Sequence, residues 1–99
     1  MPTFHVIING RKIGAHSFDR SKISVGRGKT NNIVISHSAV SRYHSIIELI
    51  NNQYVISDLG SLNGTFVNGI KCDRTILSEG DTIVYGPYTL ILISYKASR

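Results

Sequence analysis

The fold of this chain is decided by the stretch His44-Ser45-Ile46-Ile47-Glu48-Leu49-Ile50-Asn51-Asn52-Gln53-Tyr54-Val55-Ile56-Ser57. On both sides of Asn51-Asn52 the residues are rich in β-branched and other apolar types, which pack well on a pleated surface. Asparagine is a frequent turn residue. The stretch therefore predicts two strands, 44–50 and 53–57, joined by a turn at Asn51-Asn52.

The pattern of strands and turns continues toward both termini. Phe4, Val6 and Ile8 alternate with their neighbours, which is the period of a strand, and Asn9-Gly10 is a dipeptide typical of a tight hairpin turn. No window holds a convincing amphipathic helix. Further strands are expected at 11–16, 23–25, 33–35, 65–67, 70–71, 75–77, 82–85 and 88–95. Many short strands between polar turns predict an all-β fold, an antiparallel β-sandwich.

Length and composition point to one globular domain. The chain has 99 residues, of which 41% are hydrophobic and 17% are charged. A chain of this size can bury one core, and its composition is far from that of disordered proteins. We expect a single domain over 1–99, with its core at about 3–95 and a loose tail at 96–99.

Several classes of protein are disfavoured. Cys72 is the single cysteine, and the four histidines fall at no familiar metal spacing, so we expect neither an intrachain disulfide nor a metal site. The longest apolar run, 90–93, is far shorter than the roughly 20 residues of a membrane-spanning helix. The N-terminus lacks the features of a secretory signal. We expect a cytoplasmic protein without a metal, a cofactor or a membrane partner.

The charge is concentrated in the first half of the chain. The net charge is +5, and residues 1–42 hold seven basic side chains and one acidic one, whereas residues 43–99 sum to −1. A positive field of this kind attracts nucleic acid, anionic lipid or a phosphorylated partner. Charge alone does not choose among these three.

Three polar loops, 26–32, 36–44 and 58–65, interrupt the alternation. Loops cluster at the ends of a sandwich, so these three can form one site. Arg27 presents a planar fork of donors that suits phosphate, and Asn63 carries a donor and an acceptor that can clamp an extended peptide. The Gly-Lys-Thr at 28–30 is not a P-loop, because Ile23 stands where that motif needs glycine and no helix follows.

An enzyme is the least favoured interpretation. Ser41, His44 and Asp58 would have to act as nucleophile, base and orienting group, but no nucleophile elbow surrounds Ser41. We interpret His44 as bracing its loop through hydrogen bonds. Asn68-Gly69 is interpreted as a turn between two short strands.

The three blocks Gly26-Arg27, Ser41-Arg42-Tyr43-His44 and Ser61-Leu62-Asn63-Gly64-Thr65-Phe66-Val67-Asn68-Gly69, taken together, resemble the forkhead-associated (FHA) domain family. Their order and spacing both fit. The resemblance covers nearly the whole chain, since the strands from about Phe4 to Tyr95 fit the eleven-stranded sandwich of that family.

The resemblance implies a phosphothreonine-dependent module that binds peptides or proteins and has no catalytic activity. By position, Arg27 contacts the phosphate, Ser41 donates its hydroxyl or amide, and Arg42 adds a second cation. Asn63 holds the main chain of the bound peptide. The residues that the resemblance assigns to shaping the loops and the final hairpin are Gly26, His44, Gly64, Asn68 and Gly69.

One position departs from the family pattern. Many members have a threonine that helps to hold the phosphate where this chain has Leu62, and Ser61 or a backbone amide is the possible substitute. Leu62 keeps open the alternative of a phosphate-independent scaffold that uses the same fold to bind another protein. Nonspecific nucleic-acid binding is disfavoured, because the chain has no Trp and lacks interleaved basic and aromatic residues. We expect a monomer.

Overall fold

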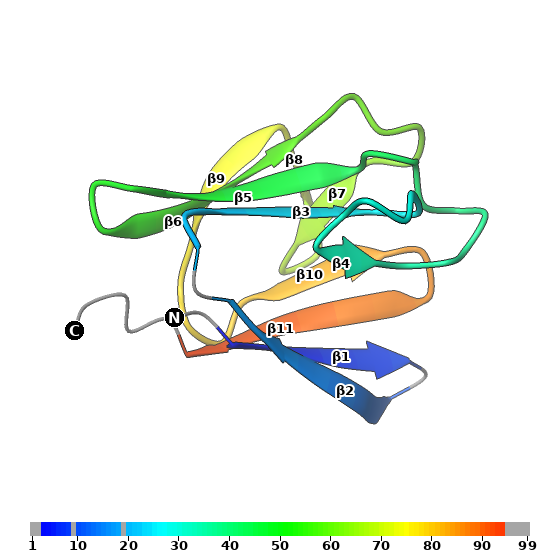
Figure 1. Cartoon of the computed structure of the whole chain (residues 1–99), viewed down its shortest axis with the longest axis horizontal. Helices are drawn as coiled ribbons and strands as arrows, with labels where there is room; N and C mark the ends of the chain where they lie inside the picture. The colour runs from blue at the N-terminus through cyan, green and yellow to red at the C-terminus, as the bar shows by residue number, and fades with distance from the viewer. Residues whose placement is uncertain (1–2, 9, 19, 95–99) are drawn as a thin grey trace.

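The computed structural model describes residues 3–8, 10–18 and 20–94, and within them every regular element is a strand (Figure 1). Asn9 of the predicted first turn and the tail at 96–99 lie outside the described residues. In chain order the strands are β1 (Thr3–Ile8), β2 (Arg11–Ser17), β3 (Lys22–Gly26), β4 (Ile33–Val34), β5 (Ser45–Ile50), β6 (Gln53–Asp58), β7 (Thr65–Val67), β8 (Ile70–Cys72), β9 (Arg74–Leu77), β10 (Thr82–Tyr85) and β11 (Tyr88–Ser94). The predicted all-β fold is confirmed.

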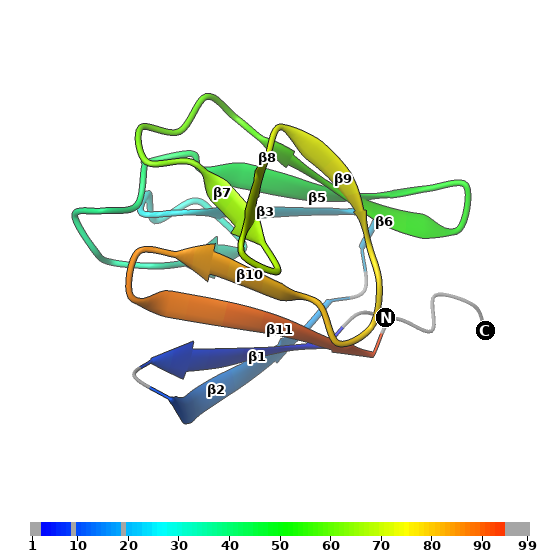
Figure 2. The same cartoon turned by 180° about the vertical axis from the view of Figure 1, so that it is seen from behind.

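The strands form two sheets that face each other, as the two opposite views show (Figures 1 and 2). One sheet has the order β2-β1-β11-β10-β7-β8, and the other has the order β4-β3-β5-β6-β9. β2 lies at one edge of the first sheet, and β4 lies at one edge of the second. The sandwich predicted from the sequence is therefore present, with loops gathered at its two ends.

One strand pair departs from the antiparallel prediction, because β3 and β4 run parallel, with Val25 opposite Ile33. The loop between them brings the chain back alongside the middle of β3. There Asn32 takes the place of a strand neighbour. Its side-chain oxygen accepts a hydrogen bond of 2.8 Å from the Ser24 N–H, and its own N–H donates to the Ser24 hydroxyl at 3.1 Å. These bonds fix the return of the chain and leave β4 short.

The turn that decided the fold has the predicted geometry. Ile50 pairs with Gln53, and the two residues between them, Asn51 and Asn52, have φ angles of 52° and 64°. Two successive positive φ angles define the hairpin turn whose twist matches that of the strands. Asn68 and Gly69 make the same kind of turn between β7 and β8, with φ angles of 52° and 83°.

The core lies between the two sheets. Large apolar side chains from both are fully buried, including those of Phe4, Ile47, Tyr54, Leu77 and Leu90. The buried hydroxyls of Ser45 and Tyr85 satisfy each other through a hydrogen bond of 2.6 Å. Burial raises the pKa of Tyr85 far above its ordinary value, and the bond to Ser45 opposes this only in part.

Among the described residues, no helix is long and apolar enough to cross a membrane.

Candidate functional site

Three loops meet at one end of the sandwich, on the right in Figure 1 and on the left in Figure 2. The first loop, 27–32, connects β3 to β4. The second loop, 35–44, connects β4 to β5, and the third loop, 59–64, connects β6 to β7. The polar segments singled out in the sequence are thus adjacent in space. The sequence-predicted site residues Arg27, Ser41, Arg42 and Asn63 all lie on these three loops.

The first and second loops are joined by backbone hydrogen bonds directly after Gly26. Arg27 N–H donates to Ser41 C=O at 2.9 Å, and Gly28 N–H donates to Arg42 C=O at 3.0 Å. The backbones approach so closely that a Cβ atom at Gly26 would overlap the Arg42 carbonyl oxygen and lie 2.9 Å from the Asn31 amide nitrogen. Only glycine fits there, because the obstructing atoms belong largely to the backbone.

Asn31 is a structural member of the site that sequence reasoning missed. Its buried amide nitrogen donates to the carbonyl oxygens of Gly28 and Arg42, each at 2.8 Å. Asn31 therefore holds the first loop closed and ties it to the second. A polar residue within a polar loop carries no signal that it will be buried, so only the tertiary structure identifies it.

His44 joins the second loop to the third. Its Nδ1 accepts a hydrogen bond of 3.1 Å from Ser41 N–H, so Nε2 carries the proton and donates to Gly64 C=O at 2.8 Å. The ring is fully buried and packs edge-on against Tyr85, with 5.0 Å between the ring centroids. These contacts fix the backbones of the second and third loops relative to each other.

The base of the third loop is organised around the carboxylate of Asp58. Oδ1 accepts hydrogen bonds from the hydroxyls of Ser61, at 2.6 Å, and Thr65, at 2.7 Å, and Oδ2 accepts from the N–H groups of Gly60 and Ser61, each at 3.0 Å. Burial works to raise the pKa of Asp58, but these four hydrogen bonds to the charged form outweigh it and the pKa lies below its ordinary value.

Asp58 and His44 do not form a catalytic triad with Ser41. The Asp58 carboxylate is hydrogen-bonded to its own loop, and both ring nitrogens of His44 are used by backbone groups. Within the described part of the chain, no three His, Cys, Asp or Glu side chains gather in a way that could hold a metal ion.

The hydroxyl of Ser41 is oriented by the third loop. Leu62 N–H donates to Ser41 Oγ at 3.0 Å, which occupies an acceptor position of the hydroxyl and leaves its proton available to a ligand. The Leu62 amide is therefore already engaged. Ser61 Oγ is engaged as well, because it donates to Asp58 and accepts from Gly64 N–H at 2.9 Å. The Ser61 hydroxyl, one of the suggested substitutes for the missing threonine, and the Leu62 amide are thus both used in hydrogen bonds within the loops.

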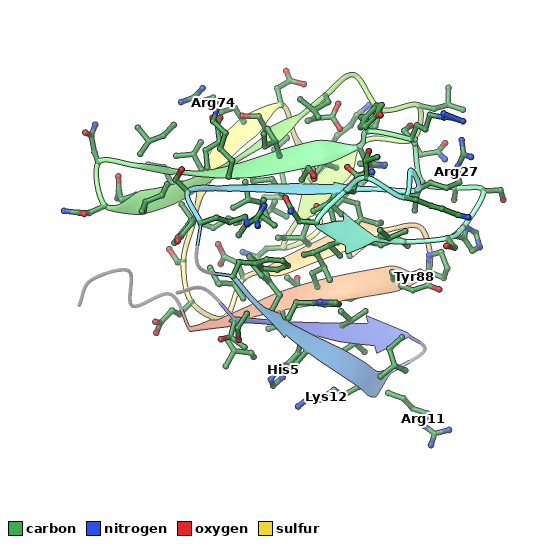
Figure 3. All side chains as sticks on the ribbon, in the orientation of Figure 1. His5, Arg11, Lys12, Arg27, Arg74 and Tyr88 are labelled. Carbon is green, nitrogen blue, oxygen red and sulfur yellow. The ribbon has the colours of Figure 1, made fainter. Side chains whose placement is uncertain are left out.

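Two arginines bring positive charge to the site. Arg27 Nε donates to the Val40 carbonyl oxygen at 3.1 Å, which anchors the guanidinium, and no described group bonds to its terminal nitrogens. Arg27 borders a surface hollow together with Ser36, His37 and Ser38, and Figure 3 shows it at the loop end of the molecule. The Arg42 side chain is also exposed. Among the described residues, neither arginine forms an ion pair with a carboxylate.

Asn63 lies at the exposed rim of the third loop, where its amide nitrogen donates to Ala39 C=O at 2.8 Å. The side-chain carbonyl oxygen has no hydrogen-bond partner among the described residues. The neighbouring Gly64 has a φ of 89°, and a Cβ there would meet the Lys71 side chain. Asn68 belongs to a different place: it bonds to Asp81 at 2.9 Å and to Thr82 N–H at 3.0 Å, and so supports the β7–β8 turn, which stands apart from the three loops.

Comparison with known proteins shows which family has this sequence pattern and architecture. The FHA domain family matches the chain over residues 23–86. The glycogen accumulation regulator GarA of Mycobacterium tuberculosis is 36% identical over 76 residues, which are 77% of this chain and 47% of GarA. The chain thus spans about half the length of the curated relatives it matches first.

Solved structures agree with this assignment. EmbR of Mycobacterium tuberculosis, in complex with a low-affinity phosphopeptide, has a TM-score of 0.83 and 29% identity, over 93% of this chain and 24% of EmbR. A second structure, from an analysis of phosphothreonine-dependent FHA domain interactions, has a TM-score of 0.79 and 25% identity, over 95% of this chain and 97% of that one. The fold, the three loops and the sequence matches together show that this chain belongs to the FHA domain family.

Proposed function

We propose that this chain is a phosphothreonine-dependent peptide-binding module that acts in kinase-linked signalling or regulated assembly. The observation that carries the proposal is the fixed arrangement of Arg27 and Ser41. The Arg27 Nε is anchored on Val40, and the Ser41 oxygen is held by the Leu62 amide, and each keeps donors that no described group uses. A site with preset donors binds without first ordering its own side chains.

The chemistry of the donors matches a phosphate group. A phosphorylated side chain carries about −1.5 to −2 charges at pH 7 and three acceptor oxygens. Arg27 and Arg42 supply two cations that no described carboxylate neutralises. Charge-assisted hydrogen bonds are roughly twice as strong as neutral ones. Arg42 therefore offsets the missing threonine hydroxyl at Leu62, since neither Ser61 nor the Leu62 amide has a donor left for the phosphate.

Recognition of the peptide main chain is assigned to Asn63. Its amide is held in place by Ala39, and its free carbonyl oxygen can accept a hydrogen bond from a backbone N–H next to the phosphothreonine. The similar protein EmbR has been solved with a phosphopeptide, which supports this type of ligand.

The test is an oriented library of phosphothreonine peptides and its unphosphorylated counterpart. We expect a preferred phosphopeptide whose affinity, measured by fluorescence polarisation, falls at least about tenfold in Arg27→Ala, because a charge-assisted hydrogen bond is worth about 1.5–3 kcal/mol. Arg74→Ala is the matched control, since Arg74 is exposed on β9 away from the loops (Figure 3). Equal binding of the two libraries, or an unchanged affinity in Arg27→Ala, would overturn the proposal.

A phosphate-independent protein scaffold is the second candidate. It is favoured by Leu62, whose side chain is 88% exposed at the rim of the site. A partner bound through Leu62 would remain bound after phosphatase treatment and would be lost in Leu62→Asp. A partner that dissociates after phosphatase treatment favours the first candidate instead.

A further inference from the structure

A second hollow opens beside the three loops, between the edges of the two sheets. It is bordered by Val6, Ile13, Val34, Ile35, Ser36 and Tyr88, which come from both sheets and from the second loop. Two of these apolar side chains are largely exposed, Ile13 at 58% and Val34 at 42%. We call this hollow the edge groove.

The shape of β2 directs Ile13 toward the edge groove. Lys12 pairs with Ile7 and Gly14 pairs with Val6, so Ile13 is the extra residue of a β-bulge. A bulge bends its strand and re-aims a side chain that regular pleating would place elsewhere. An exposed isoleucine held at a bulge, facing another exposed aliphatic side chain, forms a surface suited to an apolar group.

Strand edges lie on both sides of the edge groove. β2 is the outermost strand of one sheet, and β4 is the outermost strand of the other. Ile35 N–H donates to Gly26 C=O, so the peptide groups of Val34, one residue earlier, point away from β3. An extended peptide segment is the ligand that can use both a strand edge and alternate apolar side chains.

The edge groove is continuous with the hollow beside Arg27. Ser36 borders both hollows. His37, which borders the Arg27 hollow, also makes an edge-on ring contact with Tyr88, which borders the edge groove, and the ring centroids are 6.3 Å apart. Figure 3 shows Arg27 and Tyr88 near each other at the same end of the sandwich. A single extended ligand can therefore occupy both hollows.

The charge around the edge groove defines the ligand further. Arg11 is exposed on β2 two residues before Ile13, and Figure 3 shows it at the same end of the molecule as Tyr88. We propose that the edge groove binds a second segment of the phosphorylated ligand, in which an aliphatic residue lies between Ile13 and Val34 and acidic residues meet Arg11. This inference rests on the proposed phosphothreonine site and assigns that ligand a second anchor.

The experiment uses phosphothreonine peptides long enough to reach both hollows. The shorter dimensions of the molecule are 28 and 27 Å, and an extended chain rises about 3.3 Å per residue, so about ten randomised residues on each side of the phosphothreonine suffice. Wild type and Ile13→Asp are screened against this library and against its unphosphorylated form. Ile76→Asp is the matched control, because Ile76 is 51% exposed on β9, at the opposite edge of its sheet. Thermal unfolding verifies that each variant is folded.

We expect wild type and Ile76→Asp to select phosphothreonine together with an aliphatic residue at a fixed distance from it, followed by acidic residues. Ile13→Asp is expected to keep the selection for phosphothreonine, to lose the distant aliphatic preference, and to bind the selected long peptide about tenfold more weakly. Selection of phosphothreonine without a distant preference, or the same preference in Ile13→Asp, overturns this inference and leaves the proposed function standing. Absence of selection for phosphothreonine overturns both.

Discussion

His44 and Gly64 are joined by a buried hydrogen bond of 2.8 Å from Nε2 to the carbonyl oxygen, across 20 residues of sequence. The same imidazole accepts from the Ser41 N–H through Nδ1. One buried side chain thus connects the loop that carries Ser41 and Arg42 to the loop that carries Asn63. The two loops that carry the proposed binding groups are therefore linked through a side chain that is itself buried.

Replacement of His44 by phenylalanine is expected to destabilise the domain by about 3 kcal/mol. Phenylalanine has a similar shape but leaves Gly64 C=O and Ser41 N–H without partners, and each unsatisfied buried group costs about 1–3 kcal/mol. Urea unfolding measures the loss. His16→Phe is the control, because His16 is exposed on β2. A loss below about 0.5 kcal/mol in His44→Phe would contradict the bracing role.

Gly26→Ala is expected to destabilise the domain by at least about 2 kcal/mol, because the new methyl group would overlap the Arg42 carbonyl and the backbone must move. The comparison is Gly14→Ala, where a Cβ meets nothing within 4 Å. Thermal unfolding of both variants gives the difference. If the two substitutions had equal effects, the close approach at Gly26 would not be rigid.

The lowered pKa of Asp58 predicts how the stability of the folded domain depends on pH in the acid range. Its pKa is lowered by folding below the ordinary value of 3.8, so the carboxylate stabilises the folded state above that pH, and this stabilisation is lost as the pH falls through the lower folded value. Asp58→Asn is expected to cost about 2 kcal/mol at pH 7, and the gap from wild type should narrow below about pH 4.

Urea unfolding at several pH values measures this gap. The control is Asp73→Asn, because Asp73 is exposed. A gap that stayed constant from neutral pH to acid would show that the hydrogen bonds to Ser61 and Thr65 do not depend on the charge of Asp58.

The two arginines are expected to respond differently to replacement by lysine. Arg27 uses Nε on Val40, and in the proposed complex its terminal nitrogens bind the ligand. An ammonium group cannot do both, so Arg27→Lys should weaken phosphopeptide binding about tenfold. Arg42 has no such anchor among the described hydrogen bonds. Arg42→Lys should therefore cost clearly less. Fluorescence polarisation compares them, and equal losses would remove the special role of the Val40 anchor.

Phosphopeptide affinity is expected to fall as the pH drops below about 6, because the phosphate takes up its second proton there and loses charge. Titration between pH 5 and 7.5 measures the effect, with an unphosphorylated peptide as the reference. A flat profile from a folded protein would argue against recognition of a phosphate dianion.

Much of the fold could be predicted from the sequence, because strands and tight turns are encoded locally. The β-branched and apolar residues in 44–57 and the Asn51-Asn52 and Asn68-Gly69 turns predicted the hairpins, and the observed φ angles and registers confirm them. The parallel pairing of β3 with β4 could not be predicted, since it depends on contacts between Asn32 and Ser24.

The sequence by itself determined which residue types are available: two arginines, a serine and an asparagine, in three blocks at the spacing of the FHA family. Only the tertiary structure decided which side chains and amides around the site are buried, already hydrogen-bonded or exposed. It buried Asn31, committed the Leu62 amide and the Ser61 hydroxyl to the loops, and placed the bulged Ile13 opposite Val34. The physical reason is that a hydrogen-bonding group has few donors and acceptors, and which partner takes them depends on backbone segments far away in the sequence.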